Sequence, residues 1–105
     1  MKSPVIDSQG NKRWFNEHGL LHRDEGDLPA IVYSDGTKKW FKNGKLHGEN
    51  GLPAVEYSDG TKIWWKNGIR HRDNGLPVVE DIYGNKSWWI NGVCCRYDDW
   101  INFYL

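Results

Sequence analysis

The segment Gly-Thr-Lys-Ile-Trp-Trp-Lys-Asn at Gly60–Asn67, closed by Gly68, decides the fold because similar segments occur four times. In each copy a glycine is followed four residues later by a tryptophan, and a second aromatic residue comes directly after it. The tryptophans are Trp14, Trp40, Trp64 and Trp88, and the residues after them are Phe15, Phe41, Trp65 and Trp89. Spacings of 26, 24 and 24 residues indicate tandem copies of one structural unit.

Two kinds of turn separate the strand-like runs. The first follows the aromatic residues as Asn43-Gly44, Asn67-Gly68 and Asn91-Gly92. Asn-Gly favours a two-residue β-hairpin because both residues tolerate positive φ. The first copy has the longer Glu17-His18-Gly19 instead. The second kind of turn is Ser-Asp-Gly, which ends at Gly36 and Gly60, whereas Ile-Tyr-Gly stands at the corresponding place before Asn85.

The remaining segments also favour strands. Leu-Pro precedes runs rich in β-forming residues at 30–33, 54–57 and 78–81, and an aromatic strand is expected at 11–16 and in each later copy. No segment between residues 10 and 97 has a helical hydrophobic period. We therefore predict an all-β fold, an antiparallel meander of hairpins in about four repeats of about 24 residues.

The copies set the expected boundaries within a single domain of residues 1–105. Residues 1–9 form a lead-in, in which Val5 and Ile6 supply a short edge strand. The repeats follow at 10–35, 36–59, 60–83 and 84–97, and residues 98–105 form a C-terminal cap over the last open edge. The cap is either a short helix begun by Asp98 or Asp99 or a terminal strand, and the residues favour neither.

Composition excludes some functions and favours a compartment. The 14 basic and 14 acidic residues balance, which removes the charge signature of a general nucleic-acid or membrane binder. Cys94 and Cys95 are adjacent, too strained a pair for a disulfide, and are expected to be free thiols in a reducing compartment. The N-terminal residues lack the apolar run of a signal peptide. We predict a soluble, cytoplasmic protein without a membrane span.

The stretch Gly36–Gly48, with its Gly-x-x-x-Trp-x-Lys-Asn-Gly-Lys-x-His-Gly pattern, resembles the MORN repeat family in sequence, as does the following Tyr57-Ser58-Asp59-Gly60. The resemblance extends over about Gly10–Arg96. The doubled aromatic, the inserted Leu-Pro and the His-Arg at His22 and His71 resemble a variant group found in proteins of phages and large DNA viruses. The resemblance implies a meandering antiparallel sheet that serves as a scaffold for protein contacts, with phospholipid contacts proposed for some members.

The recurring histidines, with Cys95 as a conceivable nucleophile, are the candidates for chemistry. His22, His47 and His71 occupy one position of the copies, which Cys95 takes in the fourth. Equivalent positions in a sheet with two strands per copy lie about 10 Å apart or more, too far to share a metal ion. Catalysis requires one asymmetric group of residues rather than a reiterated one. We therefore predict no metal, no cofactor and no enzymatic activity, and expect each histidine to bond to neighbouring backbone.

Aromatic residues supply the predicted binding site. Adjacent strand residues face opposite sides of a sheet, so the tryptophans and the aromatics after them form two stripes. We assign the first stripe to the core and the second to recognition, unless the sheet curls so that both are covered. The predicted partner-binding residues are Phe15, Phe41, Trp65, Trp89, His18, Arg70 and Arg72.

We therefore predict a non-enzymatic protein-interaction module. The resemblance to the variant repeats implies a small phage or viral protein that binds and inhibits a host factor. The alternative is a nucleic-acid or phospholipid-headgroup site on a lysine row, which acidic neighbours disfavour. That row is Lys12, Lys38, Lys62 and Lys86. The sequence leaves the partner, the oligomeric state and an edge-to-edge homodimer open.

Overall fold

The computed structural model describes residues 3–24, 27–90 and 93–95, with side chains through residue 88. It confirms the predicted all-β class: antiparallel hairpins form a meander, and the described residues include no α-helix. The predicted cap at 98–105 lies outside the described residues. The strands are β1 (Val5–Ile6), β2 (Lys12–Arg13), β3 (Ile31–Val32), β4 (Lys38–Lys39), β5 (Phe41–Lys42), β6 (Lys45–Leu46), β7 (Val55–Glu56), β8 (Lys62–Ile63), β9 (Trp65–Lys66), β10 (Ile69–Arg70), β11 (Val79–Glu80), β12 (Lys86–Ile90) and β13 (Val93–Cys95).

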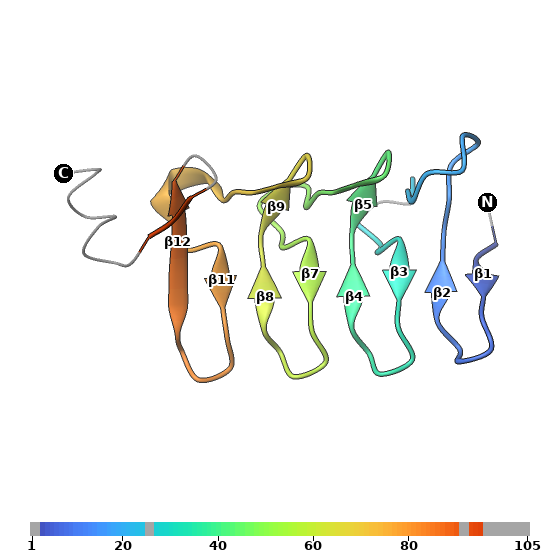
Figure 1. Cartoon of the computed structure of the whole chain (residues 1–105), viewed down its shortest axis with the longest axis horizontal. Helices are drawn as coiled ribbons and strands as arrows, with labels where there is room; N and C mark the ends of the chain where they lie inside the picture. The colour runs from blue at the N-terminus through green and yellow to red at the C-terminus, as the bar shows by residue number, and fades with distance from the viewer. Residues whose placement is uncertain (1–2, 25–26, 91–92, 96–105) are drawn as a thin grey trace.

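One continuous sheet runs along the molecule in the order β1-β2-β3-β4-β7-β8-β11-β12-β13, and every pair in it is antiparallel (Figure 1). We call this the main sheet. β1 pairs with β2, so the predicted short strand at Val5 and Ile6 is confirmed. Two small hairpins, β5–β6 and β9–β10, lie above the main sheet in Figure 1, on the side we call the loop edge.

The tight turns at the opposite side of the main sheet fix its register. In the turn after β3, Tyr33 and Thr37 pair through their backbones, Gly36 has a φ of 98°, and the Asp35 carboxylate accepts the Thr37 amide N–H at 2.8 Å. The turn between Asp81 and Asn85 has no Ser-Asp-Gly, but the two residues pair through their backbones in the same way. Here the carboxylate that accepts the Asn85 amide N–H comes from Asp81, the first residue of the turn. The altered turn therefore keeps the common geometry.

The Asn-Gly turns adopt the expected backbone. Asn43 and Gly44 have φ values of 50° and 84°, and Asn67 and Gly68 have 52° and 82°. Positive φ at both residues is the requirement for the hairpin turn that matches the twist of the strands. These turns close β5–β6 and β9–β10, whereas residues 91–92 lie outside the described part of the chain.

The aromatic strand is not one strand in the first three copies, and this corrects the prediction. Trp40 donates its backbone N–H to Ala54 of the main sheet at 2.7 Å, whereas the next residue, Phe41, pairs with Leu46 in the small hairpin. The hydrogen-bond partner of the strand changes from β7 to β6 at Trp40, so the strand divides into β4 and β5. The run at Lys86–Ile90 stays continuous as β12.

The core lies at the ends of the main-sheet strands that face the loop edge (Figure 1). Ala30 and Ala54 are fully buried and Val78 is 1% exposed, each directly after a buried proline. Trp14 and Trp64 are 8% and 6% exposed. Backbone hydrogen bonds of 2.8 Å join Trp14 to Ala30 and Trp64 to Val78. Each buried aromatic removes about 150–250 Å² from water.

We call each main-sheet hairpin, with the small hairpin and loop that follow it, a unit. The units span residues 3–29, 30–53, 54–77 and 78–95, of which residues 25–26 and 91–92 lie outside the described part of the chain. Residues of the predicted lead-in supply β1, which pairs with β2 in the first hairpin. The units follow one another along the long axis of a body of 47 × 28 × 20 Å (Figure 1).

Candidate functional site

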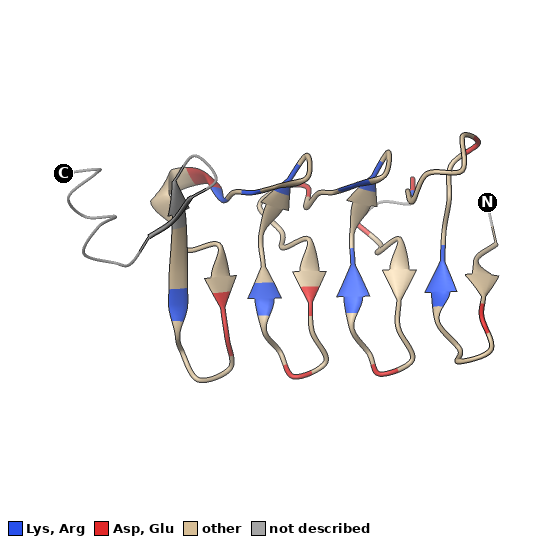
Figure 2. Ribbon diagram, in the orientation of Figure 1, with Lys and Arg blue, Asp and Glu red and all other residues tan. Residues whose placement is uncertain are grey.

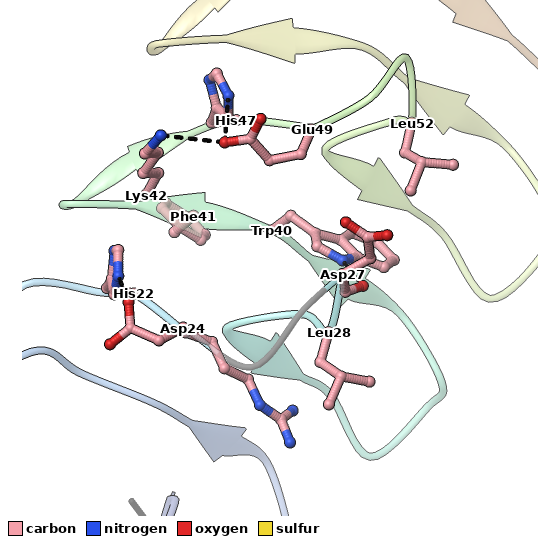
Figure 3. A pocket seen from close by; sticks show the side chains of 11 residues that line it. His22, Asp24, Asp27, Leu28, Trp40, Phe41, Lys42, His47, Glu49 and Leu52 are labelled. Carbon is pink, nitrogen blue, oxygen red and sulfur yellow. Dashed lines mark hydrogen bonds and ion pairs between the residues drawn. The ribbon is translucent and has the colours of Figure 1, made fainter. Parts of the chain in front are cut away.

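Two grooves lie side by side along the loop edge, each between the loops of consecutive units. The first groove has a volume of about 190 Å³ and includes Trp40, Phe41 and Leu52 in its lining (Figure 3). The second has about 340 Å³, and Trp64, Trp65 and Leu76 line it at corresponding positions. Adjacent units therefore place the same residue types in successive grooves.

Histidines join the units beneath these grooves. The Nδ1 atom of His22 accepts the backbone N–H of Asn43 at 2.9 Å, and Nδ1 of His47 accepts that of Asn67 at 3.0 Å. In both pairs the asparagine belongs to the turn of the next unit. Since Nδ1 accepts, the neutral ring carries its proton on Nε2. Each histidine therefore bonds to neighbouring backbone and helps to hold two units in register.

The Nε2 atom of each histidine faces an acidic side chain two residues later. His22 pairs with Asp24, His47 with Glu49 at 3.2 Å, and His71 with Asp73 at 2.6 Å. Nε2–H donates to the carboxylate in each pair. This His-x-acid pattern fixes the ring orientation in three units and gives each groove a polar wall.

Lysines add charge to these walls. Lys42 donates to Glu49 at 3.1 Å, and this bond is the main cause that lowers the pKa of Glu49 (Figure 3). The hydrogen bond from His71, followed by the charge of Lys66, lowers the pKa of Asp73. Both carboxyl groups are exposed. They therefore stay ionised at neutral pH and can take part in charge-paired contacts with a ligand.

Arginines cover two of the tryptophans. The guanidinium carbon of Arg23 lies 3.8 Å from the centre of the Trp14 ring, and that of Arg72 lies 3.7 Å from the Trp64 ring. Both arginines also donate to the carbonyl of the proline before the core residue, Pro29 or Pro77, at 3.1 Å. Flat guanidinium groups stack well on indole faces.

Exposed leucines form the rims of the grooves. Leu28, Leu52 and Leu76, each from a Leu-Pro pair, are 48%, 43% and 46% exposed. Side chains of this type at equal intervals along one edge form an apolar row rather than scattered single residues. In Figure 3, Leu28 and Leu52 lie on either side of Trp40.

Four of the predicted partner-binding residues line hollows of the loop edge. Phe41 lines the first groove, Trp65 and Arg72 line the second, and His18 lines a third hollow beside the first unit. Phe41 and Trp65 of the second stripe are half-buried. In the first stripe Trp14 and Trp64 are buried, whereas Trp40 and Trp88 are half-buried.

The remaining predicted residues take different positions. Arg70 lies over the ring of Trp65, with its guanidinium carbon 5.4 Å from the ring centre. Phe15 bridges to Leu21 and lines none of these hollows. The side chain of Trp89 lies outside the described part of the structure.

The lysine row lies in the main sheet, away from the grooves. Glu56 is the cross-strand partner of both Lys38 and Lys62, and Glu80 is the partner of both Lys62 and Lys86 (Figure 2). Basic and acidic residues therefore alternate along this face from β4 onwards. The alternation weakens the positive field that a nucleic acid or anionic headgroup would meet.

The described residues contain neither a metal-binding cluster nor a membrane-spanning helix. No three His, Cys, Asp or Glu side chains lie close enough together there to hold a metal ion. Within the same part of the chain, no helix has the length and apolar character needed to cross a bilayer.

Sequence reasoning missed the leucine rims and the arginine–tryptophan stacks. Leu-Pro was interpreted as the beginning of a strand, although its proline is buried and its leucine is exposed. One signal for the stacks was present: the residue after the recurring histidine is Arg23, Gly48 or Arg72. An arginine that recurs beside an invariant tryptophan position is a candidate for stacking.

Comparisons with protein-family models, with curated proteins and with solved structures found no match.

Proposed function

We propose that this protein is a non-enzymatic interaction module whose loop edge binds a protein partner. The observation that carries the proposal is the pair of successive grooves, each with a half-buried aromatic residue, a leucine rim and a charged wall. Protein interfaces combine an apolar centre, often aromatic, with a polar rim. An extended segment of a partner that lies along the loop edge would contact both grooves at once.

The stacked units support this proposal because they hold the grooves at fixed spacing. Backbone bonds cross from unit to unit at the loop edge, from Gly44 to Leu21 at 2.8 Å and from Gly68 to Leu46 at 2.9 Å. A prearranged surface loses little conformational entropy when it binds. The resemblance to repeats of phage and viral proteins extends the proposal to a viral protein that binds and inhibits a host factor.

Affinity capture with two matched double variants tests the proposed surface. Leu28→Ser with Leu52→Ser removes exposed side chains from the rims, so the fold should persist. Capture of a specific protein from the cells in which this protein acts should weaken about tenfold or more, because central apolar contacts dominate binding free energy. Circular dichroism would verify that the variant is folded.

The control is Lys38→Glu with Lys62→Glu, which reverses charge on the main sheet and leaves the grooves intact. We expect this variant to capture the same protein as the unmodified chain. The opposite pattern, with capture lost in the lysine variant and with a steep dependence on salt, would support the nucleic-acid or anionic-ligand alternative and contradict the proposal.

A further inference from the structure

The second unit lacks a contact that the first and third units share. Arg23 and Arg72 cover the rings of Trp14 and Trp64, and the residue at the corresponding place in the second unit is Gly48. No guanidinium or ammonium group of a described residue lies over the Trp40 ring. Trp40 is also half-buried, whereas Trp14 and Trp64 are buried.

The chain cannot supply a side chain at this place. A Cβ atom on Gly48 would lie 1.9 Å from the carbonyl oxygen of Leu52, far inside van der Waals contact. The loop of the second unit is folded so that only glycine fits. The ring of Trp40 therefore borders the first groove without the cation that covers its counterparts.

The groove beside Trp40 is suited to a cation. The indole N–H of Trp40 donates to the backbone carbonyl of Asp27 at 2.7 Å, which places the Asp27 side chain beside the ring (Figure 3). The Asp27 side chain is exposed, and its carboxylate makes no hydrogen bond or ion pair with another described residue. A ring face and an unpaired carboxylate together favour a positively charged group.

The charges of the two grooves also favour a cation in the first groove. The first groove has three carboxylates, Asp24, Asp27 and Glu49, against two permanent cations, Arg23 and Lys42. In the second groove two carboxylates face two cations, and one of these cations, Arg72, covers Trp64. The first groove is therefore the more acidic of the two, and it is the one with an uncovered tryptophan.

We propose that the first groove binds the guanidinium group of an arginine from the partner, stacked on Trp40 and paired with Asp27. This inference rests on the proposed function and adds the chemistry of the contact. A guanidinium fits better than an ammonium because it is planar and weakly hydrated. The protein itself uses arginine for the same ring in the units on either side.

A titration followed in ¹H–¹⁵N spectra by the indole N–H signals of Trp14, Trp40 and Trp64 tests the proposal. The probe is N-acetyl-arginine amide, and N-acetyl-citrulline amide is the neutral control of the same shape. We expect the arginine probe to shift the Trp40 signal and to leave those of Trp14 and Trp64 in place. Citrulline should bind about tenfold more weakly, which corresponds to about 1.4 kcal/mol.

Two variants sharpen the test. Asp27→Asn, at an exposed position, should weaken binding of the arginine probe severalfold and leave the weak citrulline binding unchanged. Arg72→Ala uncovers Trp64, so its indole signal should begin to respond to the probe. A Trp40 signal that does not move, equal responses to arginine and citrulline, or equal responses of Trp40 and Trp64 in the unmodified protein would overturn the inference.

The outcome is separable from that of the proposed function. If the arginine probe fails while Leu28→Ser with Leu52→Ser still abolishes capture, the loop edge binds its partner through other chemistry. In that case the guanidinium inference falls and the interaction module stands. If the arginine probe does not bind and the leucine variant captures the partner as well as the unmodified protein does, the loop edge is not the binding surface.

Discussion

One recurring histidine position connects the first unit to the second and the second unit to the third. The Nδ1 atoms of His22 and His47 accept backbone N–H groups from the Asn-Gly turns of the following units, and Nε2 of each ring faces a carboxylate. Both nitrogens of the ring are thus used for structure. The recurrence of this residue at first suggests metal binding. At His22 and His47 its physical cause is that the Asn43 and Asn67 N–H groups need an acceptor.

Replacement of His47 by alanine should destabilise the fold. His47 is 8% exposed, and its removal leaves the Asn67 N–H without its acceptor and opens a cavity. We expect a loss of about 2–3 kcal/mol in the free energy of unfolding, measured by urea denaturation. His18→Ala, at an exposed position, is the matched control and should change stability by less than about 0.5 kcal/mol. Similar effects of both substitutions would contradict the structural role of His47.

The turns are the elements that the sequence predicts best. Asn-Gly at Asn43 and Asn67 closes hairpins with the expected positive φ values, because this preference is local and independent of the rest of the chain. The division of the aromatic strand at Trp40 was not predicted, since alternation of side chains indicates faces but not a change of hydrogen-bond partner. The exposed leucines were missed for a similar reason: loop packing depends on contacts between units.

Acid should weaken the first turn of the main sheet. The guanidinium of Arg13, followed by hydrogen bonds from Asn11, lowers the pKa of Asp7 from 3.8 to about 2. A lowered pKa means that the folded state favours the carboxylate. The stabilisation is therefore present above pH 4 and is lost as the pH falls from about 4 to about 2.

Asp7→Asn removes this titration and keeps an oxygen that can accept the turn's N–H groups. We expect its melting temperature to depend less on pH between 2 and 4 than that of the unmodified protein. Asp81, whose pKa is lowered mainly by its bond from the Asn85 side chain, provides a second variant, Asp81→Asn, with an effect of the same sign. Parallel curves for all three proteins would show that these carboxylates do not couple folding to pH.

At the scale of the whole molecule, the stacking of units explains the elongated shape. The Cα radius of gyration is 15.1 Å, larger than the roughly 13 Å typical of a compact domain of 100 residues. Each unit contacts its neighbours along one axis, so equivalent side chains form rows instead of meeting at one centre. This arrangement gives successive grooves, to which we propose that an extended partner binds. The sequence predicted the antiparallel meander but not the leucine rims or the arginine–tryptophan stacks.

The most direct test of this account is the set of nuclear Overhauser effects at the joints between units. Lys39 of β4 and Ile63 of β8 are paired with Val55 of β7 and Val79 of β11, respectively. The account predicts cross-strand effects between the members of each pair. Effects that join Lys39 to a strand other than β3 or β7, or a helical pattern of amide contacts in these segments, would contradict it.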